Sequence, residues 1–108
     1  MRTVVVLNQD QMGHGDRALG QRILATFLRK AIALPQFETI VLYNSGVRLT
    51  APDSPVLAEL RELEGRGVDL VPCGTCLQHF GITPAVGRVS DMDSIVAELG
   101  RSEKVITL

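Results

Sequence analysis

Short apolar runs that alternate with helical patterns are the feature that most restricts the fold of this 108-residue chain. Each run is almost wholly aliphatic, which is typical of a strand buried on both faces of a parallel sheet. Strands that alternate with helices need crossover connections, and these place helices on both faces of the sheet. The predicted strands cover residues 4–8, 39–43, 68–71, a weaker 85–89 and 104–108.

Helix signals lie between these runs. Asp16 is suited to cap the first helix, which Pro35 ends, and we expect its apolar side chains Leu19, Ile23 and Phe27 to face the sheet. Further helices are predicted to start at Ser54-Pro55, Cys76 and Ser90. The sequence thus predicts a single domain over residues 1–108, a three-layer α/β/α sandwich with a mostly parallel, five-stranded sheet.

Composition narrows the classes of function. Eleven Lys and Arg residues oppose twelve Asp and Glu residues, so the formal net charge of −1 offers no field that attracts nucleic acid or an anionic membrane. No apolar run reaches the ~20 residues of a membrane span, and the first one is too short for a signal-peptide core. We expect a cytoplasmic protein. The high apolar fraction of 45% also predicts a homo-oligomer.

The two cysteines, Cys73 and Cys76, form a Cys-x-x-Cys where the third predicted strand passes into a short helix. A helix N-terminus offers unpaired N–H groups and a partial positive charge, which lower the pKa of a nearby thiol. In a reducing compartment such a pair is typical of catalysis or metal binding rather than of a structural disulfide. Because the first cysteine of such a motif is usually the more exposed, we expect Cys73 to be the nucleophile and Cys76 the resolving thiol.

Two other interpretations of the pair stay open. The cysteines are also suited to be inert, buried packing residues. Alternatively Cys73, Cys76 and His79 form part of a metal site that His14 would have to complete, since structural zinc takes four ligands. We expect no metal and no bound cofactor.

Polar residues and glycines follow the predicted strands, and the carboxyl ends of parallel strands share one edge of the sheet. We therefore expect Asn8, Asn44, Ser45, Cys73 and Cys76 to surround a common depression. Gly74 is expected to allow a tight turn and Thr75 to cap the short helix, while His79 is placed to hold a proton near Cys76. The remaining candidate binding residues are Gly15, Asp16 and Gly46.

A competing hypothesis is a non-catalytic, oligomeric subunit that binds a small anion or a nucleotide. It would use the loop from Gly13 to Asp16 and the loop from Asn44 to Gly46. The spacing of Gly13, Gly15 and Ala18 formally satisfies the dinucleotide fingerprint. However, the second strand ends at Asn44 instead of the carboxylate that would hold a ribose.

Several blocks of the chain together resemble the DsrE/F sulfur-relay superfamily, most closely the DsrE-type domain at the C-terminal end of YedF, a sulfurtransferase-like selenium-metabolism protein. The blocks are residues 15–20, 43–50, 60–68, 73–77 and 81–82. The resemblance implies an α/β/α fold of five mostly parallel strands and an oligomeric assembly. It also implies that a cysteine of the 73–76 motif carries sulfur as a persulfide between donor and acceptor proteins. TusA-like proteins are candidate partners, because YedF proteins carry a TusA-like domain that these 108 residues do not include.

Overall fold

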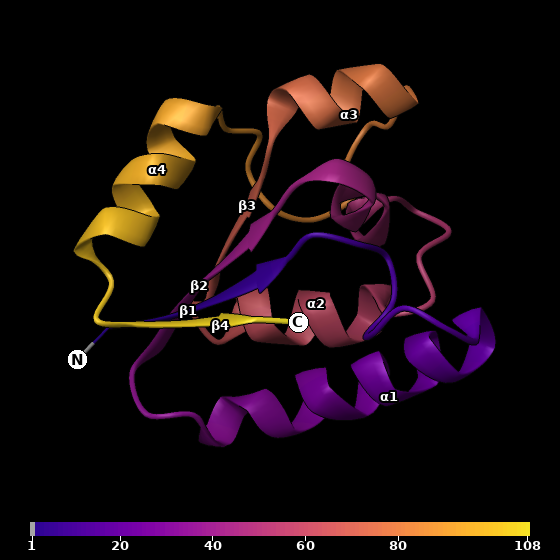
Figure 1. Ribbon diagram of the computed structural model, residues 1–108, viewed down its shortest axis with the longest axis horizontal. Coiled ribbons are helices and arrows are strands. Elements are labelled where there is room, and N and C mark those ends of the chain that lie inside the picture. Colours follow the sequence, from indigo (N-terminus) through magenta and orange to yellow (C-terminus); the bar gives the residue numbers. More distant parts are fainter. Residues whose placement is uncertain (1) are drawn as a thin grey trace.

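The computed structural model describes residues 2–108 and has an α/β fold built on four parallel strands (Figure 1). The strands lie in the order β3-β2-β1-β4, so β1 and β2 are central and β3 and β4 form the edges. All three pairings between neighbouring strands are parallel. The strands are β1 (Thr3–Leu7), β2 (Phe37–Leu42), β3 (Asp69–Pro72) and β4 (Lys104–Thr107).

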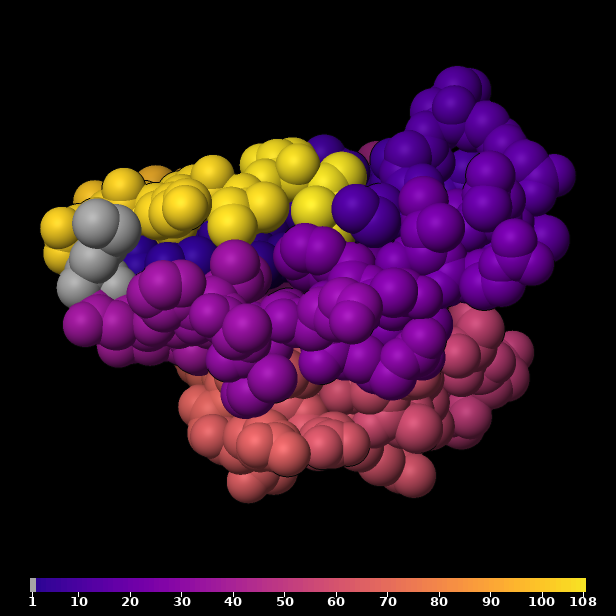
Figure 2. Space-filling view, turned by 90° about the horizontal axis from the view of Figure 1, so that it is seen from below, coloured from indigo at the N-terminus to yellow at the C-terminus, as the bar shows by residue number. Residues whose placement is uncertain are grey.

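Helices lie on both faces of this sheet, as the alternating pattern predicts. Helices α1 and α2 cover one face and α4 covers the other (Figure 1), and Figure 2 shows the first of these faces with α1 running beside α2. Within residues 2–108, none of the helices is both long and apolar enough to cross a membrane. The helices are α1 (Arg17–Lys30), η1 (Ala31–Ala33), η2 (Asn44–Thr50), α2 (Leu57–Gly65), α3 (Gly74–Phe80) and α4 (Met92–Arg101).

The strands contribute side chains to two separate cores because successive residues of a strand point to opposite faces. Val5 and Leu7 of β1 pack with Leu24 and Leu28 of α1, while Val4 and Val6 belong to the cluster beneath α4. That second cluster also contains Val41, Val71, Cys73 and Ile95. The cysteine motif is therefore anchored in the smaller core, on the α4 side of the sheet.

The prediction of a weak fourth strand at residues 85–89 was wrong. This segment runs along the outer edge of β3, where the N–H of Arg88 donates to Leu70 and the N–H of Ser90 donates to Pro72. Gly87 has a φ of +83°, which breaks the extended backbone, and only an isolated bridge between Cys73 and Ser90 remains. The sheet therefore has four strands, with an irregular segment along its β3 edge.

The predicted inner face of the first helix is also wrong by one residue. Leu24 and Leu28 are buried, whereas Leu19 and Ile23 are 47% and 41% exposed. Gly20 fixes this rotation, because a Cβ at this position would lie 2.9 Å from the Cβ of Gln11. The close approach of α1 to the loop after β1 thus decides which of two apolar rows faces the core.

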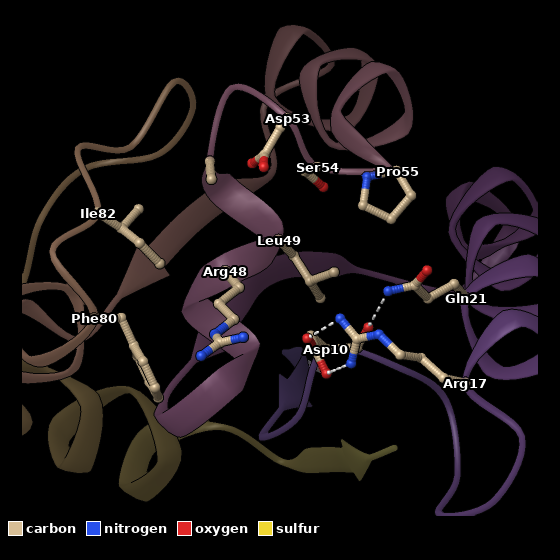
Figure 3. Close-up of a pocket in the computed structure, with 11 residues that line it drawn as sticks. Asp10, Arg17, Gln21, Arg48, Leu49, Asp53, Ser54, Pro55, Phe80 and Ile82 are labelled. Atoms are coloured by element: carbon tan, nitrogen blue, oxygen red, sulfur yellow. Dashed lines mark hydrogen bonds and ion pairs between the residues drawn. The ribbon is translucent and has the colours of Figure 1, made fainter.

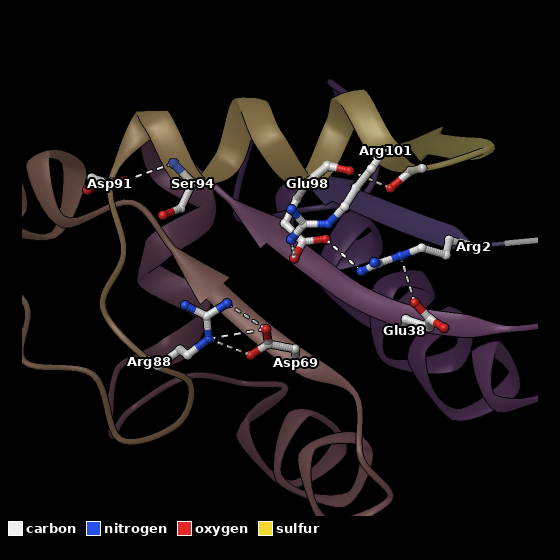
Figure 4. A network of polar contacts seen from close by, with 9 residues as sticks. Arg2, Glu38, Asp69, Arg88, Asp91, Ser94, Glu98 and Arg101 are labelled. Atoms are coloured by element: carbon white, nitrogen blue, oxygen red, sulfur yellow. Dashed lines mark hydrogen bonds and ion pairs between the residues drawn. The ribbon is translucent and has the colours of Figure 1, made fainter.

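A buried carboxylate ties α4 to the start of β1 (Figure 4). The side chain of Glu98 is only 6% exposed and pairs with both Arg2 and Arg101. Arg2 also forms an ion pair with Glu38 of β2, with Nε and Oε2 2.7 Å apart. Charged groups taken out of water need such partners, so this network fixes where α4 lies over the sheet.

Candidate functional site

The carboxyl ends of β1, β2 and β3 lie side by side, and the predicted polar residues follow them. The N–H of Tyr43 donates to the carbonyl oxygen of Leu7 at 3.2 Å, and the N–H of Cys73 donates to that of Leu42 at 2.9 Å. Asn8, Asn44, Ser45, Cys73 and Cys76 therefore come to one edge of the sheet, as the sequence predicts.

Cys73 stands at the junction between β3 and α3 and is buried. It is the N-cap residue of α3, with extended backbone, and makes no side-chain capping hydrogen bond. Only 2% of its surface is exposed, because it packs in the core beneath α4 with Val71 and Ile95. An incoming molecule does not reach this sulfur without movement of its neighbours.

Cys76 is the accessible member of the pair. It lies in the first turns of α3, is partly exposed, and is free, as is Cys73. The backbone N–H of Asn44 donates to its Sγ over 3.2 Å. Asn44 has a φ of +52°, the left-handed region that asparagine tolerates better than most residues. The residue whose N–H donates to the sulfur is thus also one of the residues with a left-handed backbone.

The environment of Cys76 raises the pKa of its thiol. Burial is the largest cause, because it disfavours the thiolate, and the neighbouring Cys73 raises the pKa further. The hydrogen bond from Asn44 acts in the opposite direction by stabilising the anion. The exposure order expected for the two cysteines is thus wrong, and the accessible thiol does not have the lowered pKa expected for a relay cysteine.

Two of the predicted glycines are required for close backbone contacts at this edge. A Cβ at Gly46 would lie 2.1 Å from the carbonyl oxygen of Leu7, so η2 can rest on the end of β1 only with glycine there. A Cβ at Gly74 would lie 2.9 Å from the carbonyl oxygen of Ser90, to which the N–H of Gly74 donates. Gly46 and Gly74 therefore position the elements that carry Asn44 and the cysteines.

Thr75 does not cap α3 as predicted, and the ring of His79 packs against its aromatic neighbour. Thr75 is an exposed residue inside α3, and the N-cap position belongs to Cys73, so the predicted capping hydroxyl is wrong. His79 is exposed and packs edge-on against Phe80, with ring centroids 5.0 Å apart. Among residues 2–108, no three His, Cys, Asp or Glu side chains gather in a group that could hold a metal ion.

The glycine loop before α1 acts mainly as a helix start. Asp16 is the N-cap of α1, and its Oδ2 accepts from the N–H of Leu19 at 2.7 Å, as predicted for a capping residue. A Cβ at Gly13 or Gly15 would meet no atom within 4 Å. The loop from Gly13 to Asp16 therefore lacks the close packing that glycines provide in a dinucleotide fingerprint.

A cavity lies between η2, α3 and the start of α1, and none of the predicted site residues lines it (Figure 3). Its volume is about 530 Å³. This cavity is distinct from the depression that the sequence predicts around the cysteines, which stays a prediction. Its lining residues are Asp10, Arg17, Gln21, Arg48, Leu49, Ala51, Asp53, Ser54, Pro55, Phe80 and Ile82.

Two charged contacts shape this cavity. Arg17 donates to both oxygens of Asp10, at 2.9 and 2.6 Å, and this pairing raises the pKa of the Arg17 guanidinium. Arg48 lies over the ring of Phe80, with its central carbon 4.5 Å from the ring centroid. Asp10 comes two residues after the first predicted strand and Arg48 five residues after the second, so their positions after strands are the sequence signal that points to them.

Solved structures with the same fold include proteins from bacteria and an archaeon. The alignment with the YchN protein from E. coli covers 100% of each chain, with 16% sequence identity and a TM-score of 0.72. MTH1491 from Methanobacterium thermoautotrophicum, a protein of unknown function, has 23% identity and a TM-score of 0.73, with 99% and 98% of the two chains covered. BT1422 from Bacteroides thetaiotaomicron, also of unknown function, has 20% identity and a TM-score of 0.72, with 99% and 94% covered.

Structures with identities this low show a common fold only, so membership of a family has to come from the comparison of sequences. No curated protein matches the chain. A sequence profile of the DsrE/DsrF-like family, in contrast, matches residues 1–108, which includes every strand, both cysteines and the cavity. With a four-stranded, all-parallel sheet like that of YchN and a profile match over its whole length, the chain belongs to the DsrE/DsrF-like family.

Proposed function

We propose that the protein is a sulfur carrier or sulfurtransferase that holds sulfane sulfur as a persulfide on the Cys73–Cys76 motif. The main support is the contact between the Asn44 N–H and the accessible Sγ of Cys76. A donor aimed at a partly exposed sulfur stabilises the thiolate that attacks and the persulfide anion that follows. The resemblance to YedF-type domains and the DsrE/DsrF-like family membership are consistent with this chemistry.

Cys76 takes the sulfur in the proposed reaction, because a donor can reach it and cannot reach Cys73. The Cys76 thiolate attacks the outer sulfur of a donor persulfide. The sulfur–sulfur bond of the donor breaks, the donor leaves as a thiolate, and Cys76 becomes a persulfide. This assignment reverses the roles that the sequence alone favours.

The sulfur leaves Cys76 by one of two balanced steps. A thiolate on an acceptor protein attacks the outer sulfur, which regenerates the Cys76 thiolate and creates a persulfide on the acceptor. Alternatively the Cys73 thiolate attacks the Sγ of Cys76, so hydrosulfide leaves and a Cys73–Cys76 disulfide forms. The first step is a relay, and the second discharges the carrier more slowly when no acceptor is present, because Cys73 is buried.

The carrier would work in an assembly and with protein partners. Exposed aliphatic side chains on both faces of the sheet support a homo-oligomer; they are Leu19, Ile23, Ile32, Val89, Met92, Val96 and Val105. Donor and acceptor proteins, including TusA-like ones, would meet the accessible Cys76. Free thiols of this kind suit a reducing compartment such as the cytoplasm.

Loading with a persulfide donor tests the proposal. The wild-type protein is treated with inorganic polysulfide, freed of excess reagent and digested, and the mass of the peptide that contains both cysteines is measured. We expect a gain of one sulfur atom that dithiothreitol removes. Absence of any gain, while Cys76 still reacts with iodoacetamide, would reject sulfur carriage and favour a binding or packing role.

A further inference from the structure

The cavity presents one cation and one anion, both exposed, that make no ion pair within residues 2–108. Arg17 and Asp10 satisfy each other through two hydrogen bonds. Arg48 makes a cation–π contact with Phe80, and within residues 2–108 it forms no ion pair. Asp53 likewise has no partner in the described part of the chain. A ligand therefore finds one guanidinium and one carboxylate available.

The charges on the wall favour a ligand that carries both signs. Two arginines and two aspartates line the cavity, so their formal charges cancel. A nucleotide or another polyanion would meet the carboxylates of Asp10 and Asp53 as well as the arginines, which is unfavourable. A molecule with one carboxylate and one ammonium group complements Arg48 and Asp53 at the same time.

The size and the remaining lining indicate something larger than one amino acid. About 530 Å³ falls within the ~300–1,000 Å³ typical of small-molecule sites. Leu49, Pro55 and Ile82 provide apolar wall, and Figure 3 shows Asp53 above the η2 ribbon and Arg48 below it, so the two charges are apart. A cavity with two separated opposite charges and apolar walls suits a peptide whose termini are charged.

We propose that this cavity binds a short zwitterionic peptide, with its carboxylate on Arg48 and its ammonium group on Asp53. Phe80 holds the guanidinium in place from the other side, which limits the entropy that Arg48 loses on binding. The site requires no sulfur chemistry, so it stands or falls independently of the persulfide proposal.

The peptide would lie close to the cysteine pair without using it. Arg48 is on η2 with Asn44, and Phe80 is on α3 with Cys76. Cys76 and Phe80 are four residues apart and so share one face of α3, about 6 Å apart along the helix axis. The same two elements therefore carry the thiol contact at one end and the cavity wall at the other.

An NMR titration with trialanine tests the site directly. We expect chemical-shift changes at the amides of Arg48, Asp53, Phe80 and Ile82. Arg48→Gln should weaken binding at least about tenfold, because the carboxylate loses its cation. Asp53→Asn should weaken binding of free trialanine and leave binding of N-acetyl-trialanine, which has no ammonium group, unchanged.

Matched controls separate recognition from loss of fold. Arg61→Gln removes an exposed arginine of α2 that does not line the cavity, and it should leave the affinity unchanged. Arg48→Lys keeps the positive charge and should bind more tightly than Arg48→Gln. The proposal is overturned if no shifts occur up to about 10 mM peptide, if capping either terminus has no effect, or if ATP binds more tightly than the peptide.

Discussion

The backbone N–H of Asn44 points at the Sγ of Cys76 from 3.2 Å away, although 32 residues separate the two in the chain. The contact exists because η2 begins directly after β2 and α3 directly after β3, on the same edge of the sheet. It joins the accessible thiol to a backbone donor, which substitutions other than proline leave in place. The hydrogen-bond donor that acts on the thiol thus comes from the backbone just after a strand end.

The first prediction concerns the pH dependence of Cys76. Because its pKa is raised, less of it is thiolate at neutral pH, and alkylation should be slow there and increase at a higher pH than for an ordinary thiol of ~8.5. Cys73→Ser should lower the midpoint, since Cys73 is one cause of the shift. Iodoacetamide rates from pH 6 to 11, read by peptide mass, give both midpoints. A wild-type midpoint below that of the urea-unfolded protein would contradict the assigned environment.

The second prediction concerns Gly46. Gly46→Ala should destabilise the fold by at least about 2 kcal/mol, since the added Cβ would lie 2.1 Å from the carbonyl oxygen of Leu7. Gly100→Ala on α4 is the matched control, because nothing lies within 4 Å of its Cβ and alanine favours helix by about 0.5–1 kcal/mol. Urea unfolding measures both. Equal effects of the two changes would show that η2 does not rest on β1 as described.

The third prediction concerns the network that holds α4. Glu98→Ala should cost about 2 kcal/mol, because its buried carboxylate bonds to both Arg2 and Arg101. Arg101→Ala should cost less than about 1 kcal/mol, because this side chain is 53% exposed and leaves Glu98 its contact with Arg2. Thermal and urea unfolding of both variants decide whether Glu98 is the centre of the network.

The fourth prediction concerns assembly. Sedimentation equilibrium should give a mass that is a multiple of 11.7 kDa at micromolar concentration. Met92 and Val96 are exposed four residues apart on one face of α4, so Val96→Asp should shift the protein towards monomer. Arg61→Asp, at an exposed polar residue of α2 on the other face of the sheet, is the control and should not. A wild-type monomer would reject the oligomer.

Local patterns were sufficient to predict the parallel sheet and the edge where the cysteines lie. Apolar runs and caps such as Asp16 act within a few residues, so the sequence shows them directly. The weak strand at residues 85–89 failed because the left-handed backbone of Gly87 depends on its packing against Leu70. Likewise α1 has two apolar rows, and only the approach of Gly20 to Gln11 chooses between them.

In the candidate site, too, some features follow from the local sequence and others from packing between distant segments. Proximity of Asn44 and Cys76 follows from parallel strands, and it could be predicted. Which cysteine is accessible could not be predicted, because Cys73 is covered by Ile95 of α4, which lies 22 residues further along the chain. The pairing of Arg48 with Phe80 likewise depends on how η2 and α3 pack together.

The most direct test of the central claim compares Cys73→Ser and Cys76→Ser after identical treatment with inorganic polysulfide. We predict that Cys73→Ser gains one sulfur atom and holds it longer than the wild type, because the thiol that would displace it is missing. Cys76→Ser should gain none, since a hydroxyl is too weak an acid to provide the nucleophile and Cys73 is buried. Loading of Cys76→Ser with none on Cys73→Ser would contradict the assignment of Cys76 as the sulfur acceptor.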